Sequence, residues 1–404
     1  MSKKKKTCYP INQLCKVIDC EHKTAPYVEL SEYLVVRTNN VRSGILVLDD
    51  IKYTTKESFI EWTQRAVPEY GDVLFTREAP AGETCLVPQT LKVCMGQRMV
   101  LLRPNKDIIN SHFLSFYLTT KECRREIYQY VIGSTVMRIN IDDILQIKIF
   151  CPPIAEQEKI ASFLGAIDQR LTQLRRKYEL LQTYKRGVMQ KIFSQEIRFP
   201  EFKNDWIYST LGKVTKYTKG FAFKSEDYLD NGIRIIRASD LDNQRIRQEN
   251  QKVCVSEEFA ENDKIKKYTV YKGNIIISTV GSKPELRSSA VGRGVYVCSD
   301  SEGLLNQNLL KFENIEDVNN RFLFAQINTS RYVDYISSIQ RGNANQSNIT
   351  VKDLLDYQIF ITSLEEQEKI ADFLTAIDRK IEAVAQQIDR TKQFKKGLLQ
   401  KMFV

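Results

Sequence analysis

The sequence is poor in the residues that most catalytic and metal sites require. Only two histidines, His22 and His112, occur in 404 residues, so a proton-shuttling imidazole is barely available to any Ser or Cys nucleophile. No G-x-x-x-x-G-K-[ST] phosphate loop occurs, and the nine cysteines include no C-x-x-C pair. These absences disfavour an enzyme and a zinc site, and they favour a binding protein or a scaffold.

Long apolar runs are also missing, because no stretch approaches the roughly 18 residues of a membrane span. The lysine-rich start has no apolar segment behind it, which disfavours a secretory signal. Scattered cysteines in odd number fit free thiols in a reducing compartment, so we expect a cytoplasmic protein. The formal net charge of +10 fits a polyanionic partner, although an ordinary basic protein would show it too.

An internal repeat organises the chain. Residues 149–194 align without a gap with residues 359–404, at an offset of 210, and 18 of these 46 positions are identical. Weaker matches continue upstream, pairing 33–37 with 233–237, 71–75 with 273–277, and 96–98 with 306–308. The sequence therefore predicts two similar domains that alternate with two helices, with boundaries at 1–153, 154–194, 195–363 and 364–404.

Each repeated tail predicts a long helix with an apolar seam, because apolar residues recur in steps of four and three. The seam residues are Ile160, Leu164, Ile167, Leu171, Leu174, Ile370, Leu374, Ile377, Ile381 and Val384. Two such stripes are expected to bury each other, although each could instead pack on its own domain. An antiparallel coiled coil is favoured, because it brings together the two ends of the second domain and relates the domains by an approximate two-fold axis.

Two lysines, Lys185 and Lys395, occupy equivalent positions in the two seams. Their aliphatic stems could carry the charges out of the bundle into water. Alternatively, polar seam residues could fix the register of the two helices. The sequence leaves both interpretations open.

Both intervening domains are expected to be mixed α/β. Short apolar runs predict strands at 34–36, 45–48, 73–75, 99–102, 233–236, 275–277 and 295–297, and helical spacing predicts helices near 111–130 and 318–337. Polar loops lie between them, and their Arg, Lys, Asn and Gln side chains suit base reading, although solvated turns look similar. The residues expected to face DNA are Arg37, Asn39, Arg42, Arg77, Arg98, Arg138, Lys219, Arg237, Ser239, Lys283, Arg287, Asn306, Gln307, Asn343, Asn345 and Gln346.

At this point the chain resembles the specificity subunit of a type I restriction–modification system. The resemblance is carried by E-Q-E-K-I-A at 156–161 and 366–371, each followed by F-L-x-A-I-D, and by the K-[RK]-G-x-x-Q-K-x-F endings at 185–193 and 395–403. The second domain also matches at Trp206, Leu211-Gly212, Lys219-Gly220-Phe221 and Asn306-Gln307-Asn308. The first domain lacks the Lys-Gly-Phe loop and has Gly96-Gln97-Arg98 in place of the Asn-Gln-Asn triplet.

The resemblance implies a non-catalytic DNA-recognition subunit. Each domain would be a target recognition domain that reads one half of a bipartite, asymmetric sequence in double-stranded DNA. The helices would set the half-site spacing and dock two modification subunits, which carry S-adenosylmethionine and the adenine methylation chemistry. Restriction subunits with ATP and magnesium would join the complex, whereas this chain would hold no cofactor or metal and meet no membrane. The alternatives are an assembly scaffold, a non-sequence-specific DNA binder, and an enzyme with a hidden nuclease or methyltransferase site.

Overall fold

The computed structural model describes residues 7–403, except 243–244, 249–250, 283–290, 300–302, 314, 316 and 344–345. The chain forms two compact units: unit 1 comprises Met1–Arg176 with Ala385–Val404, and unit 2 comprises Lys177–Val384. Each unit contains one α/β domain together with part of each of two long helices. The mixed α/β class predicted from the sequence is therefore correct.

Two sheets form the framework of unit 1. The first is a four-stranded antiparallel sheet of β2 (Cys15–Asp19), β10 (Met99–Pro104), β7 (Val73–Thr76) and β8 (Thr84–Leu86), in that order. The second contains β6 (Lys52–Thr54), β3 (Tyr33–Val36) and β9 (Lys92–Met95), with β3 and β9 parallel. Leu34 and Val93 of the second sheet share one buried cluster with Leu74 and Leu101 of the first, so the two sheets pack on each other.

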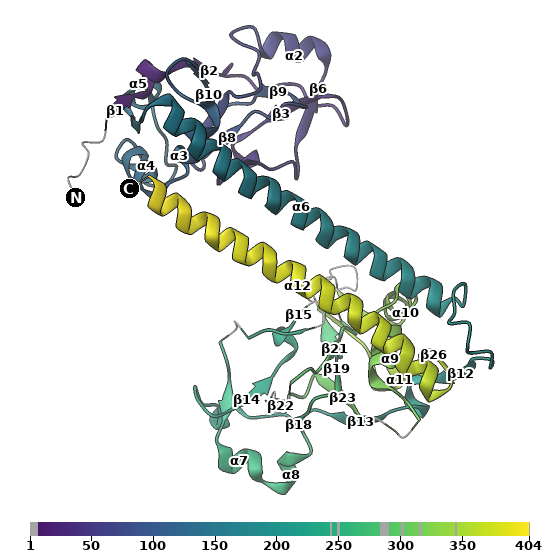
Figure 1. Ribbon diagram of the computed structural model, residues 1–404. Coiled ribbons are helices and arrows are strands. Elements are labelled where there is room, and N and C mark those ends of the chain that lie inside the picture. Colours follow the sequence, from purple (N-terminus) through teal and green to yellow (C-terminus); the bar gives the residue numbers. More distant parts are fainter. Residues whose placement is uncertain are drawn as a thin grey trace. The chain divides into compact units, whose positions relative to one another are not determined.

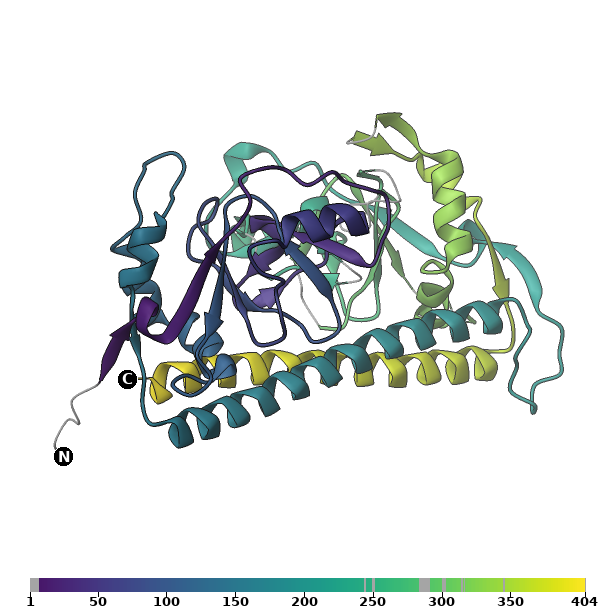
Figure 2. The ribbon, with the colours of Figure 1, turned by 90° about the horizontal axis from the view of Figure 1, so that it is seen from above.

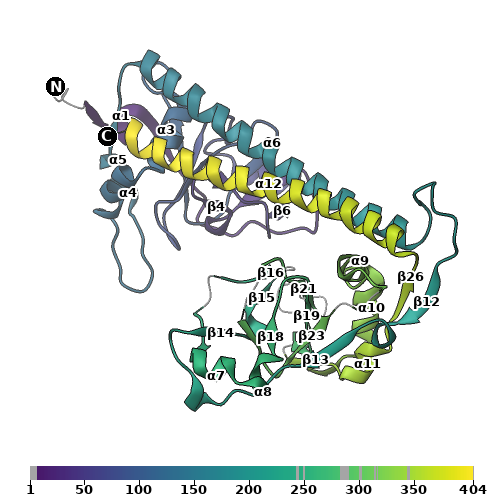
Figure 3. The same cartoon turned by 60° about the horizontal axis from the view of Figure 1, so that its bottom comes forward.

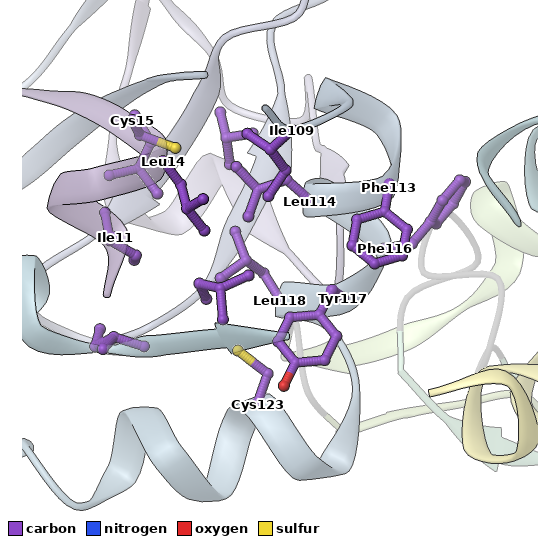
Figure 4. Packing of buried hydrophobic residues seen from close by; sticks show 14 of the residues in the cluster. Ile11, Leu14, Cys15, Ile109, Phe113, Leu114, Phe116, Tyr117, Leu118 and Cys123 are labelled. Carbon is purple, nitrogen blue, oxygen red and sulfur yellow. The ribbon is translucent and has the colours of Figure 1, made fainter. Parts of the chain in front are cut away.

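The helical region of unit 1 is divided into two helices, whereas the sequence predicted one stretch near 111–130. Helix α3 (Ser111–Leu118) ends before Thr120, whose hydroxyl accepts a hydrogen bond from the Cys123 N–H at 3.2 Å and so starts α4 (Lys121–Tyr128). Figure 4 shows Phe113, Phe116 and Tyr117 of α3 with Cys123 of α4 in the core of this unit. The remaining elements are β1 (Cys8–Pro10), α1 (Ile11–Leu14), β4 (Val41–Arg42), β5 (Ile45–Leu46), α2 (Lys56–Trp62), α5 (Ile141–Gln146) and β11 (Lys148–Phe150).

Unit 2 repeats this framework, with one more strand in its second sheet. Its antiparallel sheet is β13 (Lys216–Lys219), β23 (Leu309–Glu313), β19 (Ile275–Ser278) and β21 (Gly294–Tyr296). Its second sheet is β17 (Cys254–Val255), β14 (Ile233–Ile236), β22 (Gly303–Leu305) and β18 (Thr269–Val270), and β14 is again parallel to β22. The weak upstream matches in the sequence therefore reflect a duplicated fold.

The smaller elements of unit 2 also have counterparts in unit 1. Helices α9 (Asn320–Gln326) and α10 (Ser330–Ile339) are separated at Thr329, which caps α10 as Thr120 caps α4. Figure 3 shows α7 and α8 beside β14 and β18, at the edge of the unit. The remaining elements are β12 (Ile207–Thr210), β15 (Leu241–Asp242), β16 (Arg245–Ile246), α7 (Glu257–Glu261), α8 (Asp263–Lys266), β20 (Val280–Gly281), β24 (Arg341–Asn343), β25 (Gln346–Asn348), α11 (Val351–Leu355) and β26 (Gln358–Ile361).

Two long helices follow the domains, α6 (Ile154–Phe193, 40 residues) and α12 (Leu364–Met402, 39 residues), as Figure 1 shows. At 1.5 Å per residue each is about 60 Å long. Within unit 1, Ile160 of α6 shares a cluster with Phe403, which follows α12, and Asp168 of α6 bonds Lys395 of α12. Residue numbers therefore rise along α6 as they fall along α12. The helices are therefore antiparallel, as predicted, and the same order holds within unit 2. The seam residues are buried, with Ile381 partly buried.

The seam residues contact both the other helix and the neighbouring domain. In unit 1, Ile160 and Leu164 of α6 share a cluster with Phe113 of α3 and with Phe403, which follows α12. The ring centroids of Phe113 and Phe403 are 5.4 Å apart. The two packing alternatives left open by the sequence therefore occur together.

A buried glutamine fixes the start of each long helix, and this explains part of the E-Q-E-K-I-A motif. In unit 1, the Gln157 side chain accepts from the Asn110 N–H at 2.8 Å and donates to the Ile108 and Pro152 carbonyls at 3.0 and 2.7 Å. In unit 2, Gln367 bonds the Asn319 N–H and two carbonyls in the same pattern. Both side chains are fully buried, so each tethers a helix start to the loop that enters α3 or α9.

Three further observations concern the cysteines, possible metal ligands and possible membrane-spanning helices. All nine cysteines are free thiols, and only Cys8 and Cys298 are exposed. Within the described part of the chain, no three His, Cys, Asp or Glu side chains gather to hold a metal ion. No helix among the described residues has the length and apolarity needed to cross a membrane.

Candidate nucleic-acid interface

Three arginines of unit 1 are brought together by backbone hydrogen bonds. The Arg77 N–H, at the end of β7, donates to the Arg98 carbonyl at 2.8 Å. The Arg77 carbonyl accepts from the Ile139 N–H at 2.9 Å. These bonds place the segments of Arg77, Arg98 and Arg138 side by side, and we call these three residues the arginine cluster.

The arginine cluster has more positive charges than its carboxylate partners neutralise. Arg77 lies 3.4 Å from Asp19, and Arg98 lies 3.0 Å from Glu78 and is 54% exposed. Arg138 is exposed, and its side chain has no ion pair or hydrogen bond among the described residues. Three guanidinium groups against two carboxylates leave donors available for a phosphate or for guanine O6 and N7.

Unit 2 has two backbone hydrogen bonds equivalent to those of Arg77 in unit 1, and we call this pair of bonds the backbone frame. The side chains that it presents are different. The Thr279 N–H donates to the Asn308 carbonyl at 2.9 Å, and the Thr279 carbonyl accepts from the Ile349 N–H at 3.0 Å. Thr279, Asn308 and Asn348 therefore stand where the three arginines stand in unit 1, and we call them the amide set. Asparagine amides can bond adenine N6 and N7, so the two frames present chemistry for different bases.

Arg77, Arg98 and Arg138 were each predicted to face DNA, but their grouping into one cluster and the residues of the amide set were not predicted. Aligning the two copies at offsets of 202 and 210 pairs Arg77 with Thr279, Arg98 with Asn308 and Arg138 with Asn348. The repeat was therefore the signal that could have identified these residues. Of the Asn306-Gln307-Asn308 triplet, only Asn306, which is half-buried, and Gln307, which is exposed, were predicted to face DNA.

Several predicted DNA-facing arginines are held by acceptors of the protein itself. Arg37 donates to the Asp50 carboxylate at 2.9 Å and to the Asp50 carbonyl at 2.6 Å. Arg237 lies 3.3 Å from the buried Asp240, and Arg42 donates to two neighbouring carbonyls. These guanidinium groups hold their own loops in place, so the exposed neighbours Asn39 and Ser239 are the outward-facing residues there.

The Lys-Gly-Phe motif has a packing role. A Cβ atom at Gly220 would lie 1.9 Å from the Asn306 carbonyl oxygen, so no larger residue fits there. Phe221 forms a parallel bridge with Asn306, which joins this loop to the Asn-Gln-Asn triplet. Lys219 is exposed at the end of β13, on the same loop.

Each unit has a hairpin that follows one of its short helices, α4 in unit 1 and α10 in unit 2. Figure 2 shows the hairpin of unit 2 at the end of α10. In unit 2 the hairpin pairs β24 with β25, and Gly342 takes a φ of +114°. In unit 1 Ile132 bridges Arg138, and Gly133 takes a φ of +97°. Of the remaining predicted readers, Gln346 is exposed on β25 and Asn343 ends β24, whereas Lys283, Arg287 and Asn345 lie outside the described residues.

Comparisons with known proteins agree with this duplicated architecture. A family model described as "Type I restriction modification DNA specificity domain" matches residues 6–182 and 203–393. The type I restriction enzyme MjaVIII specificity subunit of Methanocaldococcus jannaschii is 24% identical over 384 residues, covering 91% of this chain and 84% of that protein. The putative MjaX specificity subunit of the same organism is 26% identical over 338 residues, covering 81% of this chain and 76% of the relative.

Solved structures share the fold. The crystal structure of the S subunit of a type I restriction–modification system from M. genitalium superposes with a TM-score of 0.63 at 16% identity, covering 98% of this chain and 96% of that one. Because the family model matches both halves of the chain, and each half has the same sheets and capped helices, this chain belongs to the family of type I restriction–modification DNA specificity subunits.

Proposed function

We propose that the two domains of this DNA-recognition subunit read different halves of a bipartite, asymmetric DNA target. Unit 1 would read its half through the arginine cluster, and unit 2 through the amide set. The observation that carries the proposal is one backbone frame, formed by equivalent hydrogen bonds, that presents Arg77, Arg98 and Arg138 in one unit and Thr279, Asn308 and Asn348 in the other. Arginine favours guanine and phosphate, and asparagine favours adenine, so the half-sites would differ in sequence.

We further propose that the long helices dock two modification subunits, one on each unit. The exposed aromatic side chains Tyr184 and Phe394 occupy equivalent positions, 210 residues apart, and are 53% and 55% exposed. Each precedes the seam lysine of its helix. Equivalent exposed aromatics suit two copies of the same partner. In this proposal S-adenosylmethionine, ATP and magnesium belong to the partner subunits, this chain holds no cofactor, and the complex works in the cytoplasm.

The decisive experiment is to map the methylated positions in host DNA with and without this chain. Arg98→Ala should relax discrimination in one half of the recognised sequence, and Asn308→Ala should relax it in the other. Each change should cost about 1–3 kcal/mol of discrimination between bases. Loss at both halves from one substitution would contradict independent reading by the two domains.

A sequence-independent DNA scaffold is the alternative function. It would show a steep dependence of affinity on salt concentration but no preference among duplexes. Binding to the methylated sequence and to a scrambled duplex of equal length, at one salt concentration, separates the two. Equal affinities would replace our proposal with the scaffold.

A further inference from the structure

In unit 2 a peptide segment covers the first turns of α12. Arg198 donates two hydrogen bonds of 2.7 Å to the carboxylate of Glu366, which is fully buried. The rings of Phe199 and Phe373 meet edge to face with centroids 6.0 Å apart. Lys369 forms an ion pair with Glu201 and lies over the Phe199 ring, 5.2 Å from its centroid.

The covered face is therefore a small recognition surface for an Arg-Phe-Pro-Glu segment, whose last two residues lie in a turn closed by the Phe202 N–H and the Phe199 carbonyl at 3.2 Å. Its three contact residues on α12 are Glu366, Lys369 and Phe373, which we call the α12 triad. They are spaced by three and four residues, so they share one face of the helix. Trp206, at the end of the segment, donates a hydrogen bond to Glu366 at 3.1 Å and lines a pocket with Ile370.

The same three residue types occur at the same spacing on α6. Glu156, Lys159 and Phe163, which we call the α6 triad, lie 210 positions before their α12 counterparts. All three belong to unit 1 and are exposed, and Phe163 is 46% exposed. Among the described residues, no ring contact, ion pair or side-chain hydrogen bond involves any of the three.

We propose that the α6 triad is a docking site for a segment of a partner polypeptide with the pattern Arg-aromatic-Pro-Glu, which turns at the proline as the covering segment of unit 2 does. The partner arginine would bond Glu156, its glutamate would pair with Lys159, and its aromatic ring would cover Phe163. The covered α12 triad defines this chemistry, because it meets each of these groups with the same residue type. The site does not depend on DNA reading, so failure of one proposal leaves the other standing.

A partner is the favoured occupant because this chain's own matching segment is already bound. Its arginine, phenylalanine and glutamate are engaged by the α12 triad within unit 2. A segment in the same chain also benefits from a high effective concentration, of about millimolar order for short linkers, which a detached peptide lacks. A binding measurement must therefore reach roughly 1 mM peptide.

The test uses a labelled peptide of residues 195–206, titrated onto the full chain and followed by fluorescence anisotropy. We expect saturable binding of one peptide per chain, weakened about tenfold by Phe163→Ala, which corresponds to about 1.4 kcal/mol. Leu180→Ala is the matched control, since Leu180 is another exposed apolar residue on α6 (52%) and lies outside the triad. It should leave the affinity unchanged.

A charge-reversal pair tests the orientation of the segment. Glu156→Lys should abolish binding of the natural peptide, and a peptide with glutamate in place of Arg198 should restore it. Three results would overturn the proposal: no saturable binding up to 1 mM, binding that survives Phe163→Ala, or a dimer of the chain that Phe163→Ala dissociates. The last result would make a second copy of this chain the occupant.

Discussion

Lys395 donates hydrogen bonds of 2.6 and 2.8 Å from Nζ to both carboxylate oxygens of Asp168, across the two helices of unit 1. In unit 2, Lys185 makes the equivalent bond of 2.6 Å to Asp378. Each lysine belongs to the K-[RK]-G ending of one helix, and each aspartate belongs to the A-I-D motif of the other helix. The two repeated motifs therefore bond each other across the helix pair. These polar seam lysines therefore have specific partners across the coiled coil, which supports the register interpretation.

Lys395→Met should lower the Tm of the chain by at most about 1–2 °C, because it removes one interhelical ion pair worth at most about 1 kcal/mol. The expected cost is small since the side chain of Asp168 is 43% exposed. A double-mutant cycle with Asp168→Ala measures the coupling directly by thermal unfolding. Additive effects of the two substitutions would mean that the pair does not fix register.

Gln157→Ala should destabilise the chain more strongly, by about 2–3 kcal/mol. The substitution leaves the half-buried Asn110 N–H and the carbonyls of Ile108 and Pro152 without their side-chain partner. Gln169→Ala, on the exposed face of the same helix, is the matched control and should change the unfolding free energy by less than about 0.5 kcal/mol. Equal losses in urea denaturation would show that the buried amide does not anchor α6.

Glu366 predicts a dependence of stability on pH. Burial alone would raise the pKa of Glu366, but hydrogen bonds from Arg198, Thr362 and Trp206 outweigh burial and lower it below the usual 4.5. A carboxyl group with a lowered pKa in the folded state stabilises the protein above its ordinary pKa, and the effect is lost as pH falls through the folded value. The wild-type chain should therefore be more stable than Glu366→Gln at pH 7, and the difference should shrink below about pH 4.5. Thermal unfolding of both chains from pH 7 to pH 4 measures this, and a constant difference would contradict it.

The sequence predicted the helices and the repeat well because both depend on local, periodic patterns. The seam residues recur every three to four positions, and the proline pair lies directly before the first residue of α6, where proline is tolerated. The strand 45–48 was predicted too long, since only Ile45 and Leu46 pair, with β4. The division between α3 and α4 was missed because a single capping hydroxyl at Thr120 decides it.

The candidate interface was harder to predict, because loop partners depend on tertiary contacts. Arg37 and Arg237 were predicted to face DNA, and the structure pairs them with Asp50 and Asp240, partners that the sequence did not reveal. Their contact with DNA stays a prediction. Thr279 was not predicted, because only its hydrogen bonds to segments some 30 and 70 residues away place it beside Asn308 and Asn348. Comparison of the two copies, rather than the character of each loop, was the informative signal.

The two domains should differ in how strongly salt weakens their DNA binding. Arg138→Ala removes an exposed cation, so it should reduce the slope of log affinity against log salt by about 1 if this side chain contacts a phosphate. Asn348→Ala, at the equivalent position, should change base preference and leave the slope unchanged. Competition binding at several salt concentrations measures both quantities. A reduced slope for Asn348→Ala would contradict the division of chemistry between the two frames.

If the helices determine the spacing of the half-sites, shortening both of them should change the preferred gap. Deleting one heptad from each helix, residues 175–181 and 382–388, keeps the apolar seam in phase and removes about 10 Å of helix. That length corresponds to about three base pairs of DNA, so the preferred gap should shrink by about three base pairs. Binding should also weaken, because three base pairs rotate one half-site by about 100° relative to the other.

Duplexes with graded gaps between the half-sites measure this preference. As a control, deleting four residues from each helix breaks the apolar seam and should abolish folding of the helix pair. A preferred gap that is the same after the heptad deletion would mean that the helices do not set the spacing.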